Sequence, residues 1–234
     1  MELFQTTEFW HFVFRWIHFL AGITWIGVLY YFNFVQTPFF KGADGAVRSG
    51  MIRGLVPRAL WWFRWGAMFT FLSGLGMLTI MTSYEHLPMA GSTMTLILTG
   101  ALMGTLMWAN VWFVIWPAQK IVIASAEKVA AGGEAIPEAA ARGATAGMAS
   151  RTNTLLSLPM LFCMGAARHL PIERGEGSLM NYWLIMGAII ALVEINGLIK
   201  PGAATQKMLT SVSGVIHAGV LMTIVTFLVA FNMF

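Results

Sequence analysis

The stretch Trp16–Phe40, WIHFLAGITWIGVLYYFNFVQTPFF, contains no Asp, Glu, Lys or Arg. It is longer than the ~20 apolar residues that a helix needs to cross a bilayer. The rest of the chain is similar: 58% of the 234 residues are hydrophobic and only 10% are charged, whereas a soluble domain carries about 25% charged residues. The sequence therefore predicts an integral membrane protein. It excludes the soluble globular, disulfide-rich secreted and disordered classes.

We predict an all-α fold, a polytopic membrane-helix bundle that forms a single transmembrane domain over residues 1–234. Apolar stretches indicate six transmembrane helices, at about 10–36, 61–81, 93–116, 155–167, 182–199 and 213–234. The fourth is the least apolar. Its helix is expected to begin well before the membrane, near Pro137, because no helix breaker follows until Pro159. The two long loops, 41–59 and 119–150, have room for short surface helices.

The basic residues predict how the chain crosses the bilayer. The loops after spans one, three and five contain Lys41, Arg48, Arg53, Arg58, Lys120, Lys128, Arg142, Arg151, Lys200 and Lys207. The opposite loops contain only Arg168 and Arg174. Because cytoplasmic loops are enriched in Lys and Arg, both termini are expected to lie outside the cytoplasm. Topology also accounts for the net charge of +4, so nucleic acid is not an expected partner.

One face of the first span carries the residues best suited to hold a cofactor. His11, Arg15, His18, Gly22 and Trp25 follow one another at steps of four, three, four and three, which places them on one helix face. A neutral imidazole is a good ligand for haem iron, Gly22 leaves room for the edge of a macrocycle, and Arg15 could pair with a propionate. The alternative is a buried His18 that bonds to a neighbouring helix, with Arg15 reaching the interface.

Further ionisable residues lie at membrane depth, where they are costly and often functional. His169 ends the fourth span on the same side as His18 and is a candidate for the opposite axial position; His217, inside the sixth span, is another. Arg64, Glu194 and His217 lie towards the cytoplasmic side of three different spans, and we expect them to contact one another as a proton relay or a structural ion pair. Cys163 is the only cysteine, which excludes an intrachain disulfide and covalent haem attachment.

Several segments resemble the membrane domain of bacterial urate hydroxylase, a family in which a cytochrome c domain follows the membrane domain. In collinear order they are Arg15–Gly27 (RWIHFLAGITWIG), Trp62–Trp65 (WFRW), Gly104–Gln119 (GTLMWANVWFVIWPAQ), Asn153–Phe162 (NTLLSLPMLF) and Arg168–Pro171 (RHLP). The spacing of His18, Trp25 and Gly27 is also similar to the first helix of copper-resistance membrane proteins and of the membrane protoporphyrinogen oxidase that binds haem b. In the latter, this histidine position is an axial ligand.

The resemblance implies a haem b-binding redox protein of a bacterial inner membrane. His18 would be an axial ligand with His169 or His217 opposite, and Arg15, Gly22 and Trp25 would lie beside the ring. Electrons would pass to a separate cytochrome c-type partner, with urate or a related small molecule as the substrate of the oxidoreductase.

Two differences weigh against this interpretation. The family pattern has histidines where this chain has Leu98 and Thr152, and the sequence ends at Phe234 without a cytochrome c domain. Both favour an alternative, in which the protein is a cofactor-free accessory subunit of a larger respiratory or photosynthetic membrane complex.

Cysteine labelling tests the predicted topology. In a Cys163→Ala background, a Gly45→Cys side chain should be protected from a membrane-impermeant thiol reagent in intact cells and react after permeabilisation. A Gly91→Cys side chain, in the connection between spans two and three, should react in intact cells. Labelling of position 45 in intact cells would contradict the proposed orientation.

Overall fold

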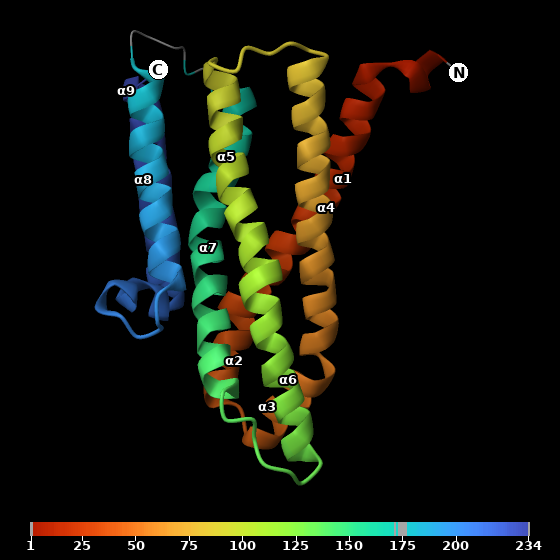
Figure 1. Ribbon diagram of the computed structural model, residues 1–234, viewed down its shortest axis with the longest axis vertical. Coiled ribbons are helices and arrows are strands. Elements are labelled where there is room, and N and C mark those ends of the chain that lie inside the picture. Colours follow the sequence, from red (N-terminus) through yellow and green to blue (C-terminus); the bar gives the residue numbers. More distant parts are fainter. Residues whose placement is uncertain (1, 171, 173–176, 234) are drawn as a thin grey trace.

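The computed structural model describes residues 2–170, 172 and 177–233, and these residues form helices and connecting loops without a strand. Arg174, Pro171 and Phe234 lie outside the described residues. Figure 1 shows long helical segments aligned roughly with the longest axis of the molecule. The long segments are α1 (Thr7–Tyr30), which continues through η2 (Tyr31–Gln36) and α2 (Thr37–Gly42); α4 (Val56–Ser83); α5 (Ser92–Ala109), which continues through η3 (Asn110–Ile115) and α6 (Trp116–Ala130); α7 (Ala139–His169); α8 (Leu179–Leu198); and α9 (Val212–Met233). Three short helices complete the described chain: η1 (Glu2–Gln5), α3 (Gly45–Gly54) and η4 (Ala204–Thr210).

Five segments are long and apolar enough to cross a membrane: Thr7–Gly42, Val56–Ser83, Ser92–Ala130, Leu179–Leu198 and Val212–Met233. They correspond to the first, second, third, fifth and sixth predicted spans. The beginning of α1 and the end of α9 lie at the same end of the bundle (Figure 1). This agrees with an even number of crossings, whereas the side of the membrane that this end faces stays a prediction.

The fourth predicted span lies in α7, which is long enough to cross a membrane but is not among the segments that are apolar enough. As expected, its helix begins near Pro137, at Ala139, and continues through Pro159. α7 contacts α5, α6, α8, α9 and, less extensively, α1 and η2. Many of its buried residues are small or polar, among them Ala149, Asn153 and Ser157. A helix surrounded by other helices packs through small residues and needs little apolar surface. Its role as a sixth span stays a prediction.

The first long loop contains a short helix, as predicted, whereas residues 119–150 contain the ends of two long helices and no separate short helix. The first contains α3, and the second is shared between the end of α6 and the start of α7. Gly132, with φ of +85°, terminates α6 in a left-handed backbone conformation that glycine adopts without steric cost.

α1 and α5 each widen into a π-helical segment just before a proline. η2 precedes Thr37-Pro38 and η3 precedes Trp116-Pro117. A proline lacks the N–H donor and its ring crowds the carbonyl four residues earlier. The π turn relieves this because its hydrogen bonds span five residues, as between Thr37 N–H and the Phe32 carbonyl. Both π segments contact α7.

α1 and α4 approach each other closely along small residues. A Cβ atom added to Gly66 would lie 3.1 Å from the backbone nitrogen of Trp25, and one added to Gly76 would lie 2.9 Å from the Phe14 ring. Small residues let membrane helices pack backbone against backbone. The α1 face that carries the predicted cofactor residues is therefore held against α4.

Substitution of Gly66 tests this packing. Gly66→Leu should separate α1 from α4 and destabilise the protein by about 1–3 kcal/mol, as overpacking does. Gly27→Leu is the matched control, because nothing lies within 4 Å of a Cβ there and the residue is exposed. Thermal unfolding in detergent should show a lower melting temperature for Gly66→Leu only; equal stability of the two variants would contradict the α1–α4 contact.

Candidate functional site

His18 packs against α4 through one nitrogen of its ring. Its Nδ1 lies 3.2 Å from Ser73 Oγ. The Ser73 hydroxyl donates its proton to the Phe69 carbonyl at 2.6 Å, so Ser73 can only accept a hydrogen bond from His18. This assigns the ring proton to Nδ1 and leaves the lone pair of Nε2 free.

The arrangement of His18 is the one that a metal ligand needs. A ligating histidine commonly donates its second ring N–H to an oxygen, which fixes the tautomer and the ring orientation. The ring also makes a hydrogen bond with the backbone of Thr70, and the side chain is partly exposed. The chemistry of His18 therefore fits a ligand that binds through Nε2.

Other residues of the predicted cofactor face also contact α4 or one another. Arg15 donates to His11 Nε2 at 3.1 Å, and His11 Nδ1 lies 2.6 Å from Glu85 Oε1. These hydrogen bonds connect α1 to the residues that follow α4, at the end of the bundle that carries the N-terminus. Gly22 faces Thr70, and Trp25 is 2% exposed. The space predicted for a macrocycle edge at Gly22 is thus bordered by α4.

The two candidates for a second axial ligand lie elsewhere. His169 is exposed at the end of α7, and His217 is exposed on α9. α9 packs against α7 and α8, whereas α1 packs mainly against α4. No described contact joins either histidine to His18, and the second ligand stays a prediction.

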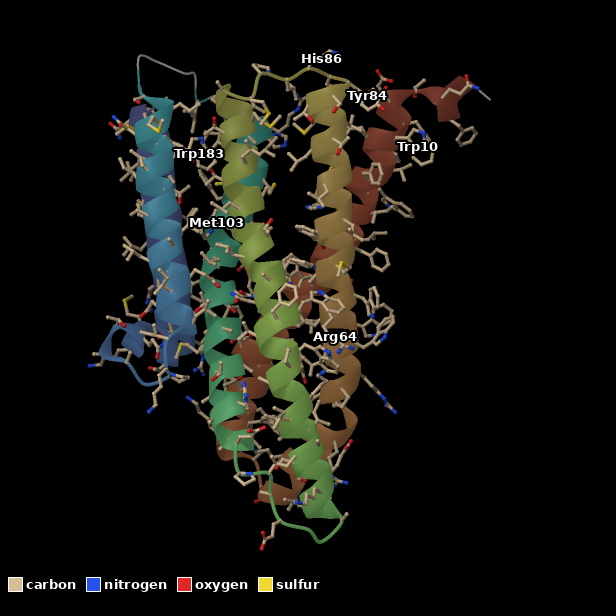
Figure 2. All side chains as sticks on the ribbon, viewed as in Figure 1. Trp10, Arg64, Tyr84, His86, Met103 and Trp183 are labelled. Carbon is tan, nitrogen blue, oxygen red and sulfur yellow. The ribbon has the colours of Figure 1, made fainter. Side chains whose placement is uncertain are left out.

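Arg64, Glu194 and His217 have separate surroundings, so the structure does not bring them together as expected. The Arg64 guanidinium carbon lies 3.3 Å from the centroid of the Trp116 ring, a cation–π contact. Figure 2 shows Arg64 on the half of α4 away from the chain ends. Glu194 accepts a hydrogen bond from Asn110, and His217 is exposed.

Glu194 instead belongs to a buried polar network that joins three helical segments. Asn110 Nδ2, in η3, donates to Asn153 Oδ1 in α7 at 2.9 Å and to Glu194 Oε2 in α8 at 3.2 Å. Asn153 Nδ2 donates to the Met107 carbonyl at 2.9 Å. Glu194 was predicted from the sequence as a site residue, whereas Asn153 was not. The available signal was a run of polar residues, 150–154, directly before the apolar residues 155–156 of the same helix.

A second set of polar contacts lies on the other side of α7. Asn33, in η2, donates to Ser150 Oγ at 2.8 Å, and the Tyr30 hydroxyl lies 2.9 Å from Ser157 Oγ. Each π segment therefore presents an asparagine to α7. Together the two sets fix α7 between α1 and α5, and they place hydrogen-bonding groups through the middle of the bundle.

Asn110 is the residue on which the first set depends. Asn110→Leu should leave Glu194 and Asn153 each without a donor, at a cost of about 1–3 kcal/mol for each buried group. Melting temperatures in detergent should fall clearly below that of the wild type. Asn232→Leu is the control, because this exposed side chain bonds only to the Leu228 carbonyl of its own helix. An unchanged melting temperature for Asn110→Leu would contradict the network.

Comparison with protein families gives one match: the family described as urate oxidase N-terminal matches residues 80–230. The matched part begins in the last turn of α4 and reaches into α9, so it contains Asn110, Asn153 and Glu194 but not His18. Searches of curated proteins and of solved structures gave no match. The resemblance to urate hydroxylase is thereby confirmed at the level of the family, whereas the similarity to haem-binding and copper-resistance proteins stays a prediction. Because the match covers more than half of the chain, the protein belongs to the urate oxidase N-terminal family.

Proposed function

We propose that this chain is the membrane-embedded part of a urate hydroxylase-like oxidoreductase in a bacterial inner membrane, and that it binds haem b through His18. The observation that carries the proposal is the family match over residues 80–230. The family description supports oxidation of urate or a related small molecule as the reaction, and the apolar helices support its location in a membrane.

The haem assignment rests on the hydrogen bonding of His18. Ser73 holds the Nδ1 proton, which leaves Nε2 as the ligand atom. Arg15 would pair with a propionate by exchanging its bond to His11, and His169 or His217 would supply the second axial ligand. When bound, haem b would supply a one-electron carrier inside the membrane.

The expected direction of electron flow is outward. With the topology predicted from the basic residues, the end of the bundle that contains both chain ends faces away from the cytoplasm. His18 lies in the half of α1 nearer to that end. A cytochrome c-type protein on that side is therefore the proposed electron acceptor.

An absorption spectrum tests the haem assignment. The purified protein should show a b-type spectrum after reduction with dithionite, and His18→Ala should lose or greatly weaken it while the protein stays folded. His86→Ala is the matched control, because this exposed histidine lies in the loop after α4. His169→Ala and His217→Ala identify the second ligand. A full spectrum in His18→Ala would contradict the ligand role.

Electron transfer is tested separately. Membranes that contain the protein should reduce added cytochrome c when supplied with urate, and His18→Ala membranes should not. A protein without any haem spectrum and without this activity would favour the alternative, a cofactor-free accessory subunit of a larger respiratory or photosynthetic complex.

A further inference from the structure

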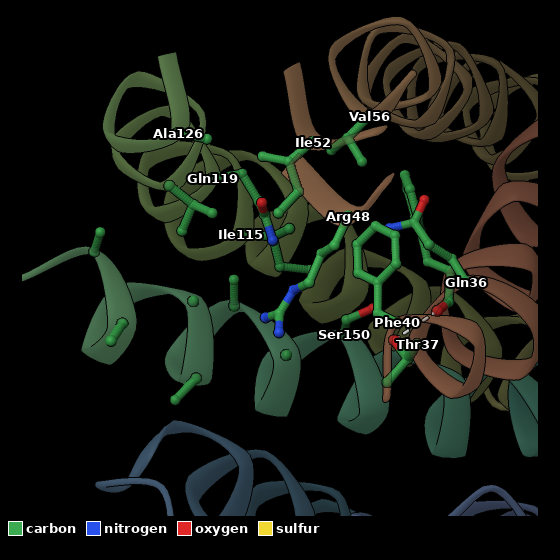
Figure 3. A pocket seen from close by; sticks show the side chains of 18 of the residues that line it. Gln36, Thr37, Phe40, Arg48, Ile52, Val56, Ile115, Gln119, Ala126 and Ser150 are labelled. Carbon is green, nitrogen blue, oxygen red and sulfur yellow. Dashed lines mark hydrogen bonds between the residues drawn. The ribbon is translucent and has the colours of Figure 1, made fainter. Parts of the chain in front are cut away.

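A cavity of about 1010 Å³ lies at the end of the bundle away from the chain ends. Its walls come from η2, α2, α3, α4, α6 and α7 (Figure 3). Part of the wall is aromatic and aliphatic, including Phe32, Phe40 and Phe63, and part is polar, including Gln36 and Gln119. A ligand here would meet both apolar surface and hydrogen-bonding groups.

Three cationic side chains line this cavity. Lys41 comes from α2, Arg48 from α3 and Arg151 from α7, and none of the described residues in its walls is acidic. The acidic residues of this end of the protein are exposed and lie outside the walls: Asp44, Glu127, Glu134 and Glu138. No ion pair is found for the three cations within the described part of the chain. The cavity therefore carries uncompensated positive charge.

Arg48 is placed to meet a ligand. Its guanidinium carbon lies 5.8 Å from the centroid of the Phe40 ring. Figure 3 shows the side chain extending from α3 over α7 into the cavity. A guanidinium held against a ring and without a carboxylate partner keeps its N–H donors available for an anion.

Gln36 supplies an independent indication of a ligand. It is only 9% exposed, it lines the cavity, and its buried Oε1 has no hydrogen-bond partner. A buried carbonyl oxygen without a donor is costly, and most such groups in proteins are satisfied. An N–H or O–H group of a ligand would satisfy it.

We infer that this cavity binds, from the cytoplasmic side, a small planar organic anion that also carries N–H or O–H donors. The cations bind the oxygens of the anion, Gln36 Oε1 accepts from its donor, and the phenylalanine rings cover its flat faces. Urate is an anion of this class, and only the choice of urate as the ligand rests on the proposed function.

The test is equilibrium binding of urate to the full chain in nanodiscs of phosphatidylcholine. Arg48→Gln should raise the dissociation constant about tenfold, because it removes one charge-assisted contact. Arg53→Gln is the matched control: it lies on the same helix, is exposed and does not line the cavity. Gln36→Leu should also weaken binding. Melting temperatures of all variants verify that they are folded.

Two further measurements test whether the cavity binds an inorganic anion or a lipid headgroup in place of an organic anion. Sulfate, which lacks donors, should compete weakly, and nanodiscs with added phosphatidylglycerol should leave urate binding unchanged. Sulfate competing as well as urate would overturn the requirement for donors, and loss of urate binding in anionic nanodiscs would assign the cavity to a lipid headgroup. Equal affinity of Arg48→Gln and wild type, or no binding to wild type, would overturn the inference.

Spectra of the same samples separate this inference from the proposed function. Urate binding by a chain without a haem spectrum would support the cavity and contradict the haem assignment. A haem spectrum without urate binding would contradict the cavity alone.

Discussion

Polar groups inside a bilayer need hydrogen-bond partners from the protein, because lipid tails offer none, and the arrangement of this bundle depends on that constraint. α7 carries Thr152, Asn153 and Ser157 fully buried. On the lipid-facing surface Asn153 and Ser157 would lose their partners on other helices. At the centre Ser157 bonds to α1, Asn153 bonds to η3 and to the Met107 carbonyl of α5, and Thr152 bonds to its own helix. The apolar helices α4, α8 and α9 can face lipid, so α7 occupies the interior.

The π segments supply the partners that α7 requires. Pro38 and Pro117 force the preceding turns to widen, and each widened turn contains an asparagine that bonds to α7. Asn110 also reaches Glu194 in α8. The two irregular turns thus connect α7 to α1 on one side and to α5 and α8 on the other. A regular helix with hydrogen bonds over four residues would present a different set of side chains at these depths.

The helix order and most helix boundaries could be predicted from hydropathy and from prolines, because apolar length and helix breakers are local properties of a sequence. The family could be recognised from motifs on several helices. Contacts between helices could not be predicted. Arg64 and Glu194 lie at comparable depth on different helices, yet one packs on Trp116 and the other bonds to Asn110. Depth along a helix follows from counting residues, whereas the direction in which a side chain points depends on packing of the whole bundle.

The same limit applies to the basic residues at the end of the bundle away from the chain ends. With the predicted topology, Lys41, Arg48 and Arg151 would lie in or near cytoplasmic loops, but topology sets no requirement that three cations from three helices line one cavity. Nor does it require the acidic residues of that end to lie outside the cavity walls, as they do. Lys41 and Arg48 line the cavity while their side chains remain exposed to solvent. The convergence of these cations beside a buried, unpartnered Gln36 carbonyl is a property of the fold, and a bound anion accounts for it where topology alone does not.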